Sequence, residues 1–263
     1  MLPNVLLLKI SPPMQSWGVS DKFVESRKTN RFPTKSGVIG LIASALGWDR
    51  DHDLTDLNKL RMGVRIDSPG DMAYDYQTTK MFEDKASKLS HRWYLTDAVF
   101  LVALEGDDPE FLEDISWALG NPAFNIFAGR KAFPLNPDLV QSVTEDSTIE
   151  EVFDSTPWMG VEFDKPDKLE VLIDAKGNED NLLTLTDFPV SFDYDSREWA
   201  DRTIARSWVD LKKDEESFSS DAMDMLRLGD VLGMGLETSG DEVVSPGAPV
   251  TVEEDVQEEE VDW

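Results

Sequence analysis

The chain has 263 residues, of which 40% are hydrophobic and 10% aromatic, so it can build an ordinary core in one large domain or two small ones. It contains no cysteine, which excludes disulfide bonds and thiolate metal sites. Its formal net charge of −28 argues against a nucleic-acid partner, because Lys and Arg make the contacts to phosphates. No stretch resembles a signal peptide or a membrane span, and we expect a cytoplasmic protein without membrane contact.

The negative charge is distributed unevenly along the chain. Residues 214–263 hold 16 acidic residues and a single basic one, Arg227. We therefore expect residues 1–212 to form the folded domain, and residues 213–263 to be an acidic, largely disordered extension with at most a short helix. Residues 1–48 have the opposite balance, with six basic residues against two acidic ones. This local reversal of sign needs an explanation of its own.

The N-terminal elements have clear local signals. Residues 4–10 are predicted to form a buried strand, and a polar loop then runs to Thr34. A helix is expected to begin there, because Thr34 or Ser36 can cap it and its apolar residues recur at helical spacing. Gly47 stands where a glycine commonly ends a helix.

The following segments alternate between strand and helix patterns. A short helix is expected near Asp53, then a strand at 61–66, a projecting hairpin or arm at 72–95, a strand at 97–104 and a helix at 109–120. Later strand candidates are residues 168–174 and 196–211. The order strand, helix, strand, arm, strand, helix predicts an α+β, ferredoxin-like fold, a layout that RNA-recognition domains also use.

Motifs for enzymatic chemistry are missing from the sequence. The acids of DRDHD at 49–53 have the spacing of a calcium loop, but Leu54 and Leu60 occupy positions that require Gly and Glu. His52 and His91 are the only histidines, which excludes histidine metal clusters. There is no phosphate-binding loop of the nucleotide-hydrolysing type. We therefore predict no metal, no cofactor and no catalytic residue.

The start of the predicted helix offers a site for anions. Helix N-termini carry unpaired N–H groups and the positive end of the helix dipole. Here Arg31, Lys35, Ser36 and Gly37 surround the start, and no acid stands among them. These residues are candidate phosphate ligands. The alternative is that they only cap the helix and carry solvated charge.

The loop before this helix mixes aromatic and basic residues. Its candidate RNA-binding residues are Gln15, Trp17, Lys22, Arg27 and Lys28. Such a mixture suits single-stranded RNA, whose bases stack on aromatic rings while its phosphates pair with cations. The alternative for Trp17 is packing in the core.

Two further segments carry basic residues. In GRKAFPL, Gly129 would let the backbone approach a ligand, and Arg130 and Lys131 are the only charges. The arm carries Lys80, Lys85, Lys88, His91 and Arg92, next to Trp93 and Tyr94. The alternative for GRKAFPL is a surface loop that binds no ligand. The alternative for the arm is a solvated hairpin. All four basic segments lie in loops or in the arm, where binding residues are commonly found.

The chain resembles the CasD family, the RAMP-type subunits of type I-E CRISPR Cascade antiviral surveillance complexes. The resemblance covers about residues 4–210 and rests on segments in this order: PMQSWG, RFPTKSG followed by VIGLIASALG, the DYQTT and HRWYLTDAVFLVAL region, GRKAFPL and SREW. It implies a modified ferredoxin or RRM fold with a protruding thumb, formed by residues 72–95.

The resemblance also implies a function. The subunit would bind the repeat-derived 5′ handle of CRISPR RNA without cleaving it, cap the backbone filament, and contact the backbone subunit CasC and the large subunit CasA. Target DNA would be met only through the assembled complex. The PMQSWG loop, Arg31–Gly37 and Gly129–Lys131 would line the handle.

Two other functions remain open at this point. Type I-C relatives are metal-independent endoribonucleases that cleave repeat RNA with Tyr, Lys and His side chains, and here His91, Tyr94 and Lys88 would have to serve. An acidic scaffold that contacts only proteins is the third possibility, although it gives the basic segments no purpose.

Overall fold

The computed structural model describes residues 2–18, 26–80, 87–160, 165–177 and 179–211. These residues belong to a compact unit, Met1–Lys212. The predicted acidic extension at 213–263 lies outside the described residues, so the division of the chain at residue 212 stays a prediction. None of the helices in the described parts is long and apolar enough to cross a membrane.

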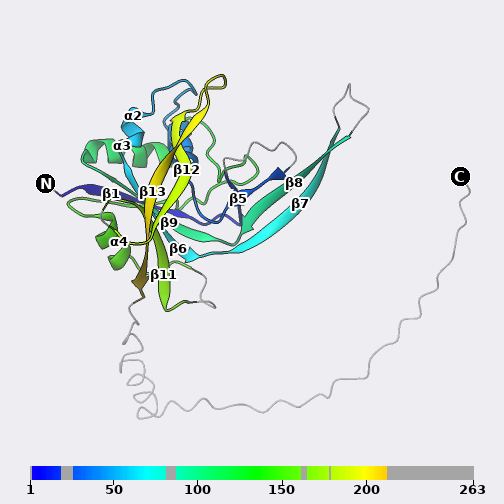
Figure 1. Cartoon of the computed structure of the whole chain (residues 1–263). Helices are drawn as coiled ribbons and strands as arrows, with labels where there is room; N and C mark the ends of the chain where they lie inside the picture. The colour runs from blue at the N-terminus through cyan, green and yellow to red at the C-terminus, as the bar shows by residue number, and fades with distance from the viewer. Residues whose placement is uncertain (1, 19–25, 81–86, 161–164, 178, 212–263) are drawn as a thin grey trace, which may run out of the picture. The chain divides into compact units, whose positions relative to one another are not determined.

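A seven-stranded antiparallel sheet organises the unit (Figure 1). Its strands are β1 (Asn4–Ile10), β6 (Arg61–Ser68), β9 (Val99–Gly106), β10 (Val140–Thr144), β11 (Lys168–Asp174), β12 (Leu182–Ser191) and β13 (Glu198–Asp210). Their order across the sheet is β10-β1-β9-β6-β11-β13-β12. The predicted α+β class is confirmed, and the strands predicted at 4–10, 61–66, 97–104 and 168–174 are present.

The first half of the sheet has a ferredoxin-like arrangement. Helix α1 (Lys35–Ala45) lies between β1 and β6 in the chain, and α3 (Pro109–Gly120) lies between β9 and β10. The chain therefore runs strand, helix, strand, strand, helix, strand, and these four strands are neighbours in the order β10-β1-β9-β6. Strands β11, β13 and β12 widen the sheet beyond β6.

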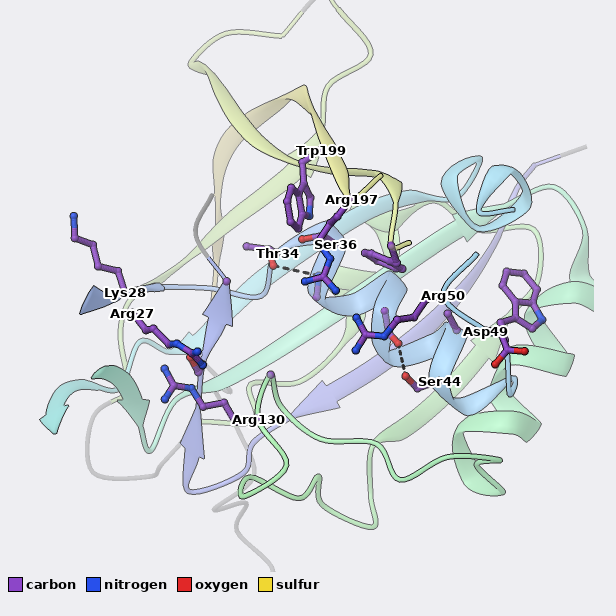
Figure 2. A pocket seen from close by; sticks show the side chains of 18 of the residues that line it. Arg27, Lys28, Thr34, Ser36, Ser44, Asp49, Arg50, Arg130, Arg197 and Trp199 are labelled. Atoms are coloured by element: carbon purple, nitrogen blue, oxygen red, sulfur yellow. Dashed lines mark hydrogen bonds between the residues drawn. The ribbon is translucent and has the colours of Figure 1, made fainter. Parts of the chain in front are cut away.

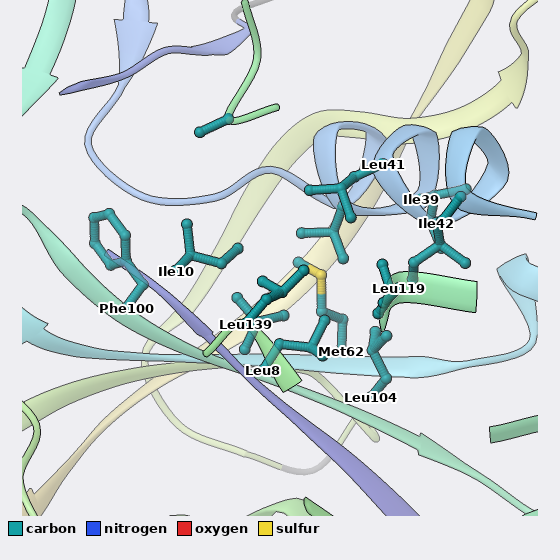
Figure 3. Packing of buried hydrophobic residues seen from close by; sticks show 14 of the residues in the cluster. Leu8, Ile10, Ile39, Leu41, Ile42, Met62, Phe100, Leu104, Leu119 and Leu139 are labelled. Carbon is teal, nitrogen blue, oxygen red and sulfur yellow. The ribbon is translucent and has the colours of Figure 1, made fainter. Parts of the chain in front are cut away.

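The sheet has a hydrophobic core on each face. Side chains of β1 alternate between the faces, because successive residues of a strand point to opposite sides. Leu8 and Ile10 pack with residues of α1 and α3, including Ile42 and Leu119 (Figure 3). Leu7 lies in the other core with residues of α4 (Ile149–Ser155). Burial on both sides explains why β1 is almost continuously apolar.

Local caps fix the ends of the helices. Thr34, not Ser36, caps α1, and its side chain accepts a hydrogen bond from the Gly37 N–H. Asp108 caps α3 in the same way, accepting from Glu110 and Phe111. The short helix α2 (Thr55–Asn58) follows Asp53, as predicted.

A long hairpin extends away from the seven-stranded sheet (Figure 1). It consists of β7 (Asp71–Lys80) and β8 (Ser87–Thr96), paired from Asp71↔Thr96 to Lys80↔Ser87. Two short strands also pair with β8, namely β2 (Met14–Gln15) and β4 (Ser26–Arg27). The strands β3 (Trp17–Gly18) and β5 (Thr29–Asn30) pair with each other. The projecting hairpin predicted at 72–95 is thus confirmed, and it brings the basic N-terminal loop to its base.

Candidate nucleic-acid interface

A cleft of about 730 Å³ lies beside α1 (Figure 2). It is lined by residues from the N-terminal loop, α1, the 46–54 loop, the 129–130 turn and the start of β13. Its charged lining residues are Arg27, Lys28, Asp49, Arg50, Arg130 and Arg197. Five of these six are basic, in a chain with 53 acidic and 25 basic residues. The cleft therefore inverts the charge balance of the protein and favours an anionic ligand.

Three arginines gather where the cleft meets the hairpin. Arg27 of β4 stands opposite Arg92 of β8 in the pairing of these strands. Arg130 donates from Nη1 to the Tyr94 hydroxyl at 2.9 Å, and its guanidinium lies 4.4 Å from the centre of the Tyr94 ring. Burial lowers the pKa of Arg130, and the charges of Arg92 and Arg27 lower it further. The three cations repel one another, and a bound phosphate would relieve this repulsion.

The structure corrects the role predicted for Lys35. Its side chain is buried, and Nζ donates to the Asp174 carboxylate at 2.8 Å and to the Leu60 carbonyl at 2.9 Å. Its backbone N–H donates to the Asp187 carboxylate at 2.9 Å. The start of α1 is therefore not free of acids in three dimensions, because Asp187 reaches it from β12. Arg202 pairs with both carboxylates and completes a buried ion cluster.

Gln15 and Trp17 are structural in this conformation. Trp17 is 1% exposed, and its indole Nε1 donates to the Gln15 side chain at 3.0 Å. Gln15 in turn donates to the Ala98 carbonyl at 2.7 Å. A Cβ at Gly37 would lie 2.9 Å from Cε3 of Trp17, so Gly37 provides room for the indole. Core packing, the alternative considered for Trp17, is the correct interpretation, and the expected base-stacking role of Trp17 is wrong.

The presence of glycine at position 129 has a local structural reason. Its φ is +81°, and a Cβ there would lie 1.7 Å from the Ser16 carbonyl oxygen. Close contact with the backbone, and not with a ligand, therefore requires glycine at this position. This contact joins the 129–130 turn to the N-terminal loop and positions Arg130 in the cleft.

The remaining predicted residues are divided between the cleft and other surfaces. Ser36, Gly37 and Lys28 line the cleft, whereas Arg31 is exposed and does not line it. Lys131 lines an adjoining hollow of about 770 Å³ that shares Arg50 with the cleft. Lys22 and the side chain of Lys80 lie outside the described residues.

Among the lining residues that the sequence did not predict, Arg50, Arg197 and Trp199 are the ones best suited to contact RNA. Arg50 lies within an acid-rich stretch, DRDHD, which hid its charge in the local balance. Arg197 and Trp199 belong to SREW, which was used only to identify the family resemblance. In Figure 2 they lie on the side of the cleft away from Arg27 and Arg130.

The three residues considered for RNA cleavage do not form one site. His91 and Tyr94 are three apart in β8, so they point to opposite faces of the hairpin. Tyr94 is 5% exposed and bound to Arg130, whereas His91 contacts the Tyr74 hydroxyl through Nδ1. The side chain of Lys88 lies outside the described part of the hairpin.

Comparison with known proteins gives a consistent result. Residues 5–205 match the family described as CRISPR-associated protein (Cas_Cas5). The chain is 32% identical to the CRISPR system Cascade subunit CasD of Escherichia coli (strain K12) over 157 residues, which cover 52% of this chain and 69% of that protein.

Two solved structures share the fold. One is a chain of a CRISPR RNA-guided surveillance complex, with a TM-score of 0.67, 30% identity, and coverage of 79% of this chain and 90% of that one. The other is a crystal structure of a Cas protein, with a TM-score of 0.62, 32% identity, and coverage of 79% and 95%, respectively.

Proposed function

Because the chain belongs to the Cas5 family of CRISPR-associated proteins, we propose that it is the Cascade subunit that binds the repeat-derived 5′ handle of CRISPR RNA. The cleft beside α1 is the proposed binding site. Its five basic residues and single acid, in a chain of net charge −28, are the observation that carries this proposal. An acidic protein gains nothing for its solubility from such a cluster, whereas a phosphate backbone requires it.

The geometry favours a single strand of RNA. Arg27 and Arg130 stand at one side of the cleft, and Arg197 stands with Trp199 at the other (Figure 2). Cations on both sides of the cleft, with an aromatic ring on one side, suit a strand whose phosphates pair with the cations while its bases lie unstacked. The buried side chains of Lys35 and Trp17 stabilise the walls of the cleft and do not take part in binding.

We extend the proposal to the wider role of the subunit, supported by its family membership. We place the chain in a modified ferredoxin-like, RAMP-type fold, with β7 and β8 as the thumb. The subunit would cap one end of the backbone filament and contact the backbone subunit CasC and the large subunit CasA. It would meet target DNA only through the assembled complex, in which base pairing by the guide supplies sequence specificity.

Co-expression with the other Cascade subunits and a CRISPR array tests the proposal. We expect the purified complexes to contain RNA whose 5′ ends are repeat-derived. Ultraviolet crosslinks from these 5′ nucleotides should map to peptides with Arg27–Lys28 or Arg130. Crosslinks that avoid the cleft and appear only on other faces of the chain would contradict the proposed site.

The subunit is expected to leave repeat RNA intact, because Tyr94 is buried and bound to Arg130 and does not share a site with His91. The measurement is incubation of the full-length chain with end-labelled repeat RNA in EDTA. Specific cleavage that His91→Ala abolishes and His52→Ala does not would instead establish the endoribonuclease, with the contact between Tyr74 and His91 as its centre.

A further inference from the structure

The side of the cleft opposite Arg27 and Arg130 carries an exposed indole and two further arginines, Arg50 and Arg197. Trp199 lines the cleft and is 37% exposed. The guanidinium groups of Arg50 and Arg197 lie 4.3 Å and 5.8 Å from the centre of the Tyr194 ring. Tyr194 therefore contacts two cations from different loops, and both cations, Arg50 and Arg197, lie on the side of the cleft that carries Trp199 (Figure 2).

These two arginines differ from the arginines of the core. Arg61, Arg65 and Arg202 each pair with a carboxylate. Among the residues that the structure describes, Arg50 and Arg197 contact an aromatic ring and form no ion pair. In a protein with this excess of acids, guanidinium groups left without a carboxylate remain available to a phosphate.

The backbone around Trp199 is shaped locally. Trp199 stands opposite Pro189 in the β12–β13 pair, and the register shifts between Pro189 and Ser191. A second shift occurs between Thr186 and Phe188. Such irregularities redirect side chains at the end of a ladder. The indole is thus presented at the cleft on a strand, which fixes its position better than a loop would.

We propose that Trp199 stacks on an unpaired base of the bound RNA, and that Arg197 and Arg50 contact the phosphates beside that base. The inference rests on the proposed function and deepens it, because it divides the cleft into a phosphate-binding side at Arg27 and Arg130 and a base-stacking side at Trp199. Stacking on an indole tolerates any base, so this side adds affinity for unstacked RNA without sequence preference.

The test compares two probes of equal charge with the full-length chain. The first probe is a fluorescein-labelled octamer of adenosine, and the second is an abasic ribose-phosphate octamer, a length within the roughly 4–16 nucleotides that single-strand sites cover. The wild type should bind the adenosine octamer more tightly. Trp199→Ala should weaken that binding by at least about fivefold, since stacking contributes about 1–3 kcal/mol per base, and should leave the binding of the abasic probe unchanged.

Two variants keep the result interpretable. Trp199→Phe retains a ring and should retain most of the preference for adenosine. Trp208→Ala is the matched control, because Trp208 lies on the same strand, is 50% exposed and does not line the cleft. Its preference should equal that of the wild type, and thermal melts of all three variants should show intact folds.

The outcomes separate the inference from the proposed function. The stacking role is wrong if the wild type prefers the adenosine probe and Trp199→Ala preserves that preference. It is also wrong if Trp208→Ala loses the preference to the same extent. In both cases the cleft remains the proposed RNA-binding site. If the wild type binds neither probe, the proposed RNA-binding function itself is wrong, and the inference falls with it.

Discussion

Replacing Lys35 by Met should destabilise the fold by about 3–5 kcal/mol, the usual cost of removing one partner from a buried ion pair. The Lys35 side chain is 5% exposed and pairs with Asp174, which is also bound by Arg202. Methionine preserves most of the aliphatic stem, so the loss of stability would measure the effect of removing the charge. The measurement is urea unfolding of the variant and the wild type.

Lys59→Met is the matched control for this substitution. Lys59 pairs with Asp56 at 2.7 Å, but both side chains are about 70% exposed, and ion pairs that water screens in this way contribute little to stability. If Lys35→Met unfolded at the same urea concentration as Lys59→Met, the buried ion cluster would have no structural role. Arg31→Glu, at an exposed position outside the cleft, should also change stability little.

The pH dependence of stability gives a second readout of the same cluster. Burial raises the pKa of Asp174, but the charges of Lys35 and Arg202 outweigh burial and hold its pKa below the ordinary value. The stabilisation that the ionised Asp174 carboxylate provides is therefore complete above about pH 3.9, the ordinary pKa of Asp. It is lost as the pH falls through the lowered pKa that Asp174 has in the folded protein. In Lys35→Met the pKa of Asp174 should rise, so acid unfolding should begin at a higher pH.

The elements predicted from the sequence are those with local signals. The buried strand β1, the helices α1 and α3, and the β7–β8 hairpin were all predicted, and for α1 the signals were helical periodicity and Thr34 as a candidate cap. Each of these signals lies within a few residues of the structure that it specifies.

The elements that were missed have weak or unused signals. Strand β12 contains Pro189 and is largely exposed at the edge of the sheet, which disguises its periodicity. Helix α4 has only seven residues. It nevertheless begins with a capping box of Thr148 and Glu151, a pattern that could have identified it.

The candidate site was predicted in part, for a physical reason. Arg27, Lys28, Ser36 and Arg130 line the cleft because loops at one end of the sheet converge there. The burial of Lys35 could not be foreseen, since its partner Asp174 lies 139 positions away in the chain. Sequence patterns locate charge along the chain, but they do not tell which cations are neutralised by distant acids.

Combining Arg27→Glu with Arg130→Gln should weaken binding of single-stranded RNA by at least about 100-fold at low salt, since a hydrogen bond to a charged group contributes about 1.5–3 kcal/mol. Both residues line the cleft. Glutamine at 130 keeps a donor for the Tyr94 hydroxyl, which Arg130 contacts in the wild type, and so limits the loss of stability. Anisotropy titrations with a labelled octamer over a range of salt concentrations would measure the effect.

The salt dependence identifies the kind of contact that is lost. Each phosphate contact to a single strand contributes about 0.7 to the slope of log affinity against log salt, so the double variant should lose about 1.4. Lys168→Glu with Lys165→Gln changes the net charge by the same amount at residues that do not line the cleft. Because exposed charges separated by more than about 10 Å are screened at 0.1 M salt, this control should bind nearly as the wild type does. Equal losses in both double variants would show that RNA senses only the total charge, and that the arginines of the cleft do not contact it.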